Sequence, residues 1–128
     1  MNDPLAGFQG QHHAQLLGTD HLLLLDDRPR ASPPGARAVE YALDVPGRVA
    51  RMVWEYRPNP PVISQIMGSV QRLRTGNTLV SFALAARIDE VDPGGAKVAE
   101  ADLVGGDDAR VQFYRVLRIG SLYRSEMP

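Results

Sequence analysis

Three histidines, His12, His13 and His21, are the residues of this sequence best suited to chemistry at neutral pH. A neutral imidazole leaves one ring nitrogen unprotonated, so it can act as a nucleophile or as a general base. The chain has no cysteine, which excludes thiol nucleophiles, zinc–thiolate sites and disulfide frameworks. His12 and His13 are adjacent and no carboxylate at a suitable spacing completes a ligand set, so no metal site is predicted.

The other polar candidates have ordinary structural explanations. Asp26 and Asp27 follow a leucine-rich run and are interpreted as loop caps rather than as a carboxylate pair for acid–base chemistry. Arg115 and Arg118 can bind an anion, although an arginine on a terminal strand is more often part of a surface ion pair. Trp54 is interpreted as core packing rather than as a stacking platform.

The composition is that of one globular domain. The 128 residues are 44% hydrophobic and 23% charged, and 14 Lys and Arg against 15 Asp and Glu give a net charge of −1. This balance argues against binding nucleic acid or a membrane surface through bulk positive charge. The longest apolar run is four leucines at 22–25, whereas a membrane span needs about 20 residues. The N-terminus has no basic region followed by a long apolar stretch, so no signal peptide is expected.

Short strands must position these candidates. The 12 glycines and 10 prolines gather in clusters, and the short runs between them alternate between apolar and polar residues. This pattern predicts an all-β fold with no helix longer than two turns. The expected strands are 11–17, 21–26, 38–43, 49–56, 69–73, 78–82, 87–91, 97–101 and 111–119.

The chain contains two copies of a four-stranded unit. Segment 14–24 aligns with 70–80, an offset of 56 residues (from 14 to 70), with the same residue at four positions. Four-stranded repeats of about this length are typical of β-propeller blades; a β-sandwich with chance similarity is the alternative. The sequence predicts a single partial propeller domain over 1–128, with blade-like units at about 11–57 and 68–103 and one extra strand at about 111–119.

Several stretches resemble the bacterial arylsulfotransferases. They are 10–14, 36–41 followed by 53–57, 68–73 running into 76–80, and 114–123. The resemblance covers about residues 7–123 and is carried by the order and spacing of these stretches. It implies a propeller of about six blades and transfer of a sulfuryl group from a phenolic sulfate ester to a phenol, through a transiently sulfurylated histidine. It implies no cofactor, and members of this family are typically exported or periplasmic.

The resemblance places the nucleophile at His12, because the family's histidine lies in a Gln-His-x-Ala stretch. It makes Gln11, Ser69 and Arg115 the expected substrate contacts, Ser69 being the hydroxyl nearest to a threonine that the family carries near the position of Gly68. Without the resemblance, a histidine near an N-terminus is more often a surface or structural residue than a nucleophile.

The sequence also departs from the family pattern. Asp27 stands where an asparagine is customary, and Asp20 and His21 replace a usual Gly-Asn turn. The family's other active-site histidines and an arginine belong to earlier blades, which this chain does not contain.

Three functions remain open. The chain can be the C-terminal part of an arylsulfotransferase, a non-catalytic remnant of a truncated or split gene, or a β-repeat interaction module without chemistry. Two blades cannot close a ring, so negligible sulfuryl transfer by the chain alone and self-association through the open blade edges are expected.

Overall fold

Eight β-strands and no helix form in the part of the chain that the computed structural model describes, residues 2–29 and 35–120. The first antiparallel sheet contains, in spatial order, β1 (Gln11–Leu17), β2 (His21–Asp26), β3 (Arg37–Asp44) and β4 (Val49–Tyr56). The second contains β5 (Ser69–Arg72), β6 (Thr78–Phe82), β7 (Arg87–Val91) and β8 (Lys97–Asp102). The predicted all-β class with two four-stranded antiparallel sheets is confirmed. None of the described residues belongs to a helix that could cross a lipid bilayer.

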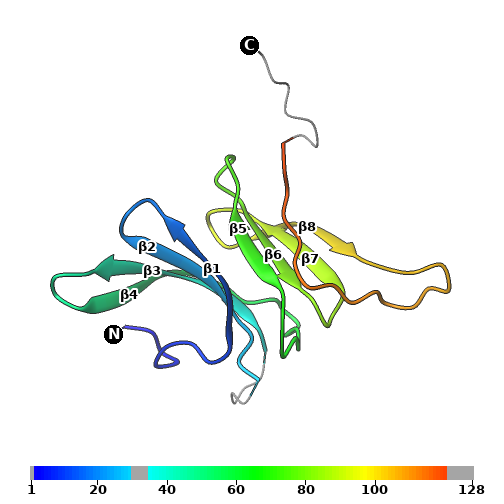
Figure 1. The fold of residues 1–128 in the computed structure, drawn as a ribbon, viewed down its shortest axis with the longest axis horizontal. Helices are drawn as coiled ribbons and strands as arrows, with labels where there is room; N and C mark the ends of the chain where they lie inside the picture. The colour runs from blue at the N-terminus through cyan, green and yellow to red at the C-terminus, as the bar shows by residue number, and fades with distance from the viewer. Residues whose placement is uncertain (1, 30–34, 121–128) are drawn as a thin grey trace, which may run out of the picture.

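One face of each sheet contributes to a shared core. The first sheet supplies Leu23 and Leu25, and the second supplies Val70, Val80 and Phe82. The sheets meet where β1 and β2 approach β5, and they diverge toward β4 and β8 (Figure 1). Leu25 and Phe82 are fully buried, and burial of a side chain of this size stabilises a fold by about 1.5–3 kcal/mol.

Gly68 permits the close approach of the two sheets. Its φ is +96°, and a Cβ there would lie 2.4 Å from the Ser81 carbonyl oxygen and 2.7 Å from Leu25 Cδ2. Neither the backbone conformation nor the space suits a residue with a side chain.

The two sheets pack front to back. In the sequence repeat, Leu23 corresponds to Leu79 and Leu24 to Val80. The first sheet places Leu23 in the shared core, whereas the second places Val80 there. Leu24 therefore lies on the face of the first sheet that points away from the core, and Leu79 lies on the corresponding face of the second. We call these the outer face of the first sheet and the outer face of the second sheet.

The N-terminal segment, residues 2–10, lies on the outer face of the first sheet. The Asn2 side chain donates to the Met52 carbonyl oxygen (3.1 Å) and accepts from the Met52 N–H (2.8 Å). Phe8 packs edge-on against Tyr41, with 6.2 Å between ring centroids. This segment thus covers part of an apolar face and occupies peptide groups at the edge of β4.

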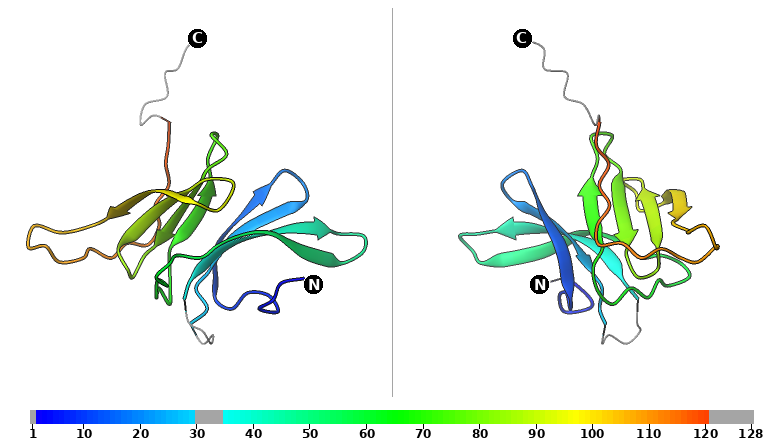
Figure 2. Two further views of the ribbon diagram at one scale, coloured as in Figure 1. Left: turned by 180° about the vertical axis from the view of Figure 1, so that it is seen from behind. Right: turned by 45° about the vertical axis from the view of Figure 1, so that its right-hand side comes forward.

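The predicted last strand at 111–119 does not form. This part of the chain is instead an extended segment that runs alongside β5 (Figure 2). In the described part of this segment, one backbone hydrogen bond joins it to the residue just before β5: Gly68 N–H donates to Tyr114 O (2.9 Å). The other contacts with β5 come from side chains: Ser69 Oγ donates to Val116 O (2.9 Å), and the Gln71 amide donates to Arg118 O (3.0 Å) and accepts from Arg118 N–H (2.7 Å). Side chains of the outer face take the place of a peptide ladder, so no ninth strand results.

Candidate functional site

Antiparallel pairing of β1 with β2 brings His12 to Asp27. His12 stands opposite Leu25, and the pairing continues beyond the strand through the Asp27 N–H to Gly10 O bond (3.1 Å). His12 and Asp27 are therefore diagonal neighbours on the face that carries Leu25. His12 Nε2 lies 3.1 Å from Asp27 Oδ2.

Asp27 is a buried carboxyl group with few partners. Its side chain is fully buried, whereas that of His12 is 33% exposed. The contact with His12 has the distance of an ion pair but not the alignment of a hydrogen bond, and no hydrogen bond reaches either Asp27 oxygen from the described residues. Burial and the adjacent Asp26 carboxylate raise the pKa of Asp27 to about 8. Near neutral pH this carboxyl group therefore retains its proton, and it becomes a carboxylate as pH rises through about 8.

The geometry assigns different roles to the two imidazole nitrogens. Nε2 faces Asp27, which leaves Nδ1 for a substrate. When Asp27 is ionised and the single ring proton is on Nε2, the lone pair is on Nδ1, and the carboxylate beside Nε2 stabilises the positive charge that forms as Nδ1 reacts. The pair can serve nucleophilic or general-base chemistry.

Asp26 and Asp27 differ in spite of their adjacency. Asp26 accepts hydrogen bonds from Gln9 N–H (2.7 Å), Arg28 Nη1 (3.1 Å) and Arg37 Nε (2.9 Å). The interpretation as a loop cap is right for Asp26 and wrong for Asp27, whose oxygens cap no backbone group in the described chain.

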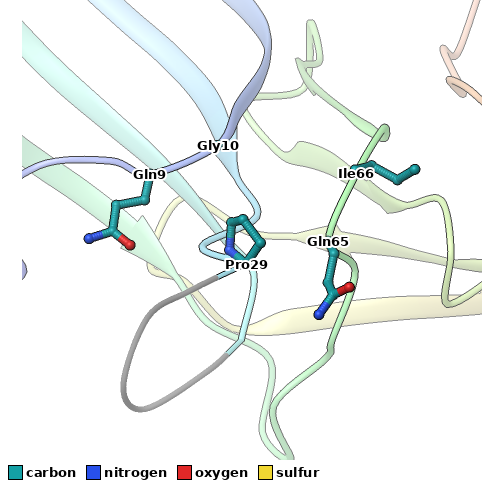
Figure 3. A pocket seen from close by; sticks show the side chains of 5 residues that line it. All are labelled: Gln9, Gly10, Pro29, Gln65 and Ile66. Carbon is teal, nitrogen blue, oxygen red and sulfur yellow. The ribbon is translucent and has the colours of Figure 1, made fainter.

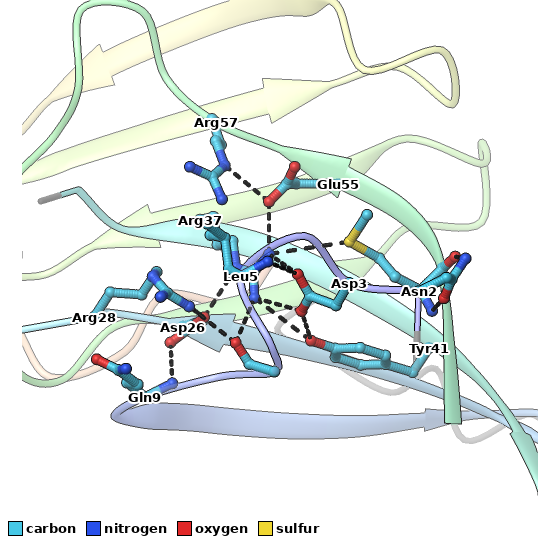
Figure 4. A network of polar contacts seen from close by, with 12 residues as sticks. Asn2, Asp3, Leu5, Gln9, Asp26, Arg28, Arg37, Tyr41, Glu55 and Arg57 are labelled. Atoms are coloured by element: carbon cyan, nitrogen blue, oxygen red, sulfur yellow. Dashed lines mark hydrogen bonds and ion pairs between the residues drawn. The ribbon is translucent and has the colours of Figure 1, made fainter. Parts of the chain in front are cut away.

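A buried arginine organises the opposite face of the first sheet (Figure 4). Arg37 is fully buried and donates to Asp26, to both Asp3 oxygens (3.2 and 2.8 Å) and to Glu55 (2.7 Å). Burial opposes ionisation of Asp3, but hydrogen bonds from Arg37 and Tyr41 outweigh it and hold the pKa of Asp3 well below its usual range. This network fastens the N-terminal segment and lies away from His12. Sequence reasoning missed this network, because the predicted strand 38–43 begins one residue after Arg37, whereas β3 begins at Arg37.

A β-bulge redirects His13. Two residues of β1, His13 and Ala14, stand opposite the single residue Leu24 of β2, and His13 has φ +44°. Strict alternation along a strand would point His13 to the face opposite His12. Because the bulge breaks the alternation, His13 instead reaches the second sheet, with Nδ1 2.7 Å from Val70 O.

His21, the first residue of β2, also has a structural role. Its Nδ1 lies 2.6 Å from Glu40 Oε1, and Glu40 in turn accepts from Arg72 Nη2 (2.6 Å) of the second sheet. Arg72 lies over the Trp54 ring at 5.6 Å, and Trp54 packs against the shared core as predicted.

The structure does not bring the other predicted site residues to His12. Gln11 is exposed and stands opposite Asp26, so alternation places it on the other face from His12. Ser69 is buried, and its hydroxyl contacts Ser81 Oγ (2.7 Å) and Val116 O (2.9 Å). Arg115 is exposed on the C-terminal segment, 5.7 Å from the Tyr114 ring.

A hollow of about 580 Å³ lies at the same end of β1 as His12 (Figure 3). Its lining combines two apolar side chains, two amides and one glycine: Pro29, Ile66, Gln9, Gln65 and Gly10. Gly10 is two residues before His12, and Pro29 is two residues after Asp27. At Gly10, where φ is +83°, a Cβ would lie 2.9 Å from Pro29 Cδ. A residue with a side chain would therefore displace Pro29, which lines the hollow.

Among residues 2–29 and 35–120, no group of three or more histidines and carboxylates is arranged to hold a metal ion. Comparison with protein-family models, with curated proteins and with solved structures finds no match to this chain.

Proposed function

We propose that this chain carries the sulfuryl-accepting histidine of a propeller-type arylsulfotransferase, with His12 as the nucleophile. The observation that carries the proposal is the contact of a half-exposed imidazole with a fully buried carboxyl group, His12 Nε2 to Asp27 Oδ2 at 3.1 Å. The front-to-back packing of two four-stranded sheets supports a propeller, since successive blades around an axis pack in this way.

The reaction has two steps in this proposal. The Nδ1 lone pair attacks the sulfur of a phenolic sulfate ester, an N–S bond forms, and the S–O bond breaks with its electron pair leaving on the phenolate oxygen. With Asp27 ionised, as it becomes when pH rises through about 8, its carboxylate takes up the proton of Nε2 as positive charge develops on the ring. In the second step a phenol oxygen attacks the same sulfur, and the phenol proton passes to solvent or to the released phenolate. The N–S electron pair returns to Nδ1 while Asp27 gives its proton back to Nε2, which restores the starting state of the pair.

The hollow between Pro29 and Ile66 suits the aryl group of such an ester. A proline ring and an isoleucine side chain offer apolar contact, and the amides of Gln9 and Gln65 can bond a phenolic oxygen or a ring substituent. Its size exceeds that of a single aromatic ring, so both small and substituted phenols fit.

In the described part of the chain, the arginines near His12 are already paired with carboxylates and are not free to bind a sulfuryl group. The three sulfuryl oxygens require fixed donors, each worth roughly 10²–10³ in rate. Of the arginines in residues 2–29 and 35–120, the two nearest to His12 in sequence are Arg28 and Arg37. Both bind Asp26, and Arg37 also binds Asp3. Catalytic turnover by this chain is therefore expected to be negligible, and reaction should stop at the sulfurylated histidine.

The test is single-turnover labelling with excess 4-nitrophenyl sulfate, read by intact mass and peptide mapping. We expect up to one sulfuryl group per chain, on His12, accumulating over hours. His12→Ala should abolish it, Asp27→Asn should slow it by about 10–100-fold, and His21→Ala should leave it unchanged. Absence of label on the native chain, or equal labelling of His12→Ala, would refute the proposal.

An interaction module without chemistry is the second candidate. The observation in its favour is β8, whose six residues are all exposed, since an open edge strand can receive a strand from a partner. The labelling experiment separates the two candidates, because a module of this kind would not react with the ester.

A further inference from the structure

The outer face of the first sheet leaves apolar surface uncovered. Leu16 is 59% exposed and Phe8 is 43% exposed. Between them and the hairpin of β3 and β4 lies a small hollow of about 60 Å³ with an apolar lining: Gly7, Phe8, Leu22, Tyr41, Leu43 and Ala50. The N-terminal segment covers this face only in part.

The outer face of the second sheet also has a hollow. It measures about 100 Å³, and four apolar side chains line it together with three charged ones: Leu79, Ile88, Ala99, Ala101, Glu90, Glu100 and Arg118. Arg118 and Glu90 form an ion pair at its border (2.7 Å). The neighbouring C-terminal segment exposes Leu117 and Ile119, the latter by 59%. Both outer faces therefore combine a shallow hollow with protruding apolar side chains.

The shared core shows how such faces fit together. It joins the face of the first sheet that carries Leu23 to the face of the second that carries Val80. In the repeat, Leu23 corresponds to Leu79, and Val80 corresponds to Leu24. The two outer faces, marked by Leu79 and Leu24, are thus the counterparts of the two faces already packed against each other.

We propose that copies of this chain associate head to tail, with the outer face of the second sheet of one copy packing on the outer face of the first sheet of the next. The repeat points to a second copy as the partner. The Leu79 face of one copy corresponds to the Leu23 face in the shared core, and the Leu24 face of the next copy corresponds to the Val80 face. Two different faces meet, so the contact is heterologous and each copy offers one face of each kind. The association does not depend on the chemistry of His12.

Two variants block one face each. Leu16→Glu places a charge on the outer face of the first sheet, and Ala99→Arg places a long cation over the hollow of the second. Both residues are exposed, so folding should be preserved, which circular dichroism checks. Val45→Glu is the matched control, because Val45 is 69% exposed in the β3–β4 turn, outside both faces.

Sedimentation velocity from about 5 to 500 µM gives the readout. We expect the native chain and Val45→Glu to form dimers and larger species as concentration rises, and each blocking variant alone to remain monomeric. An equimolar mixture of Leu16→Glu and Ala99→Arg should form one-to-one dimers and nothing larger, because one open face of each kind remains. A native chain that stays monomeric would overturn the proposal. Association of either blocking variant by itself, or a mixture that stays monomeric, would also overturn it.

Discussion

Asp27 is the residue whose environment demands an explanation. A fully buried carboxyl group without aligned donors costs free energy on ionisation, and a structural residue at this position would be more stable as a neutral amide. Its orientation toward His12 gives the carboxyl group a use that an asparagine cannot supply, namely accepting a proton from the imidazole.

The raised pKa of Asp27 predicts a specific pH dependence of stability. Because the folded-state pKa is about 8 and the ordinary value is 3.8, the folded chain retains a proton that the unfolded chain has lost between about pH 4 and 8. The free energy of unfolding contributed by this group therefore falls as pH rises through that window. Asp27→Asn should remove the decline and be more stable than the native chain at pH 8.5 by about 1–3 kcal/mol.

Urea unfolding at pH 5.5 and 8.5 measures this difference at low protein concentration. Asp20→Asn, at an exposed turn residue, is the control and should parallel the native chain. If Asp27→Asn also parallels the native chain at both pH values, the carboxyl group is not held neutral by its surroundings.

At the scale of the elements, Gly68 sets the distance between the sheets. Gly68→Ala would force its Cβ against the Ser81 carbonyl oxygen and Leu25 at positive φ. Backbone on one side and a buried side chain on the other leave little room for relaxation, so we expect a loss of at least about 2 kcal/mol in denaturant unfolding. Gly106→Ala is the matched control, because a Cβ there meets nothing within 4 Å, and should change stability by less than about 0.5 kcal/mol.

Two side chains of β5 bind the peptide groups of Val116 and Arg118 in the C-terminal segment, where no strand ladder forms. The double variant Ser69→Ala, Gln71→Ala removes the acceptors of the Val116 and Arg118 N–H groups. We expect these two amides to lose hydrogen-exchange protection while amides within β6 keep theirs. Unchanged protection at Val116 and Arg118 would mean that other contacts hold the segment.

The sequence predicts the eight strands well but not the C-terminal segment or the contact between His12 and Asp27. Alternation and turn residues predicted eight strands to within one residue at their ends, because both signals are local. The failed strand at 111–119 has the same alternation, but whether a segment joins a ladder depends on which backbone edge it meets. The His12–Asp27 contact escaped prediction for a similar reason: it depends on the register of β1 against β2, and the bulge at His13 is not marked by a glycine or proline.

At the scale of the whole molecule, polar bonds join the two sheets beside the apolar core. Tyr56 of the first sheet donates to Asp89 of the second (2.7 Å), which also binds Arg87. Burial and the bond to Asp89 raise the pKa of the Tyr56 hydroxyl well above its usual value, so it remains a donor throughout the accessible pH range.

Removing this hydroxyl tests how strongly the sheets depend on each other. Tyr56→Phe should lower the free energy of unfolding by about 1–2 kcal/mol, because Asp89 loses a buried donor. Fluorescence of Trp54 in the first sheet and far-ultraviolet circular dichroism of the whole chain should still report one coincident transition. Separate transitions in the native chain would show that each sheet unfolds by itself.

The amide of Asn2 has a consequence for chemical ageing. By donating to Met52 O and accepting from Met52 N–H, this side chain imitates a peptide group and closes the middle of β4 to strands from other molecules. Deamidation would turn it into a carboxylate, which can no longer donate to the carbonyl oxygen and would repel it. A slow hydrolysis at one residue near the N-terminus would then remove protection from an edge at which fibrous aggregates can begin.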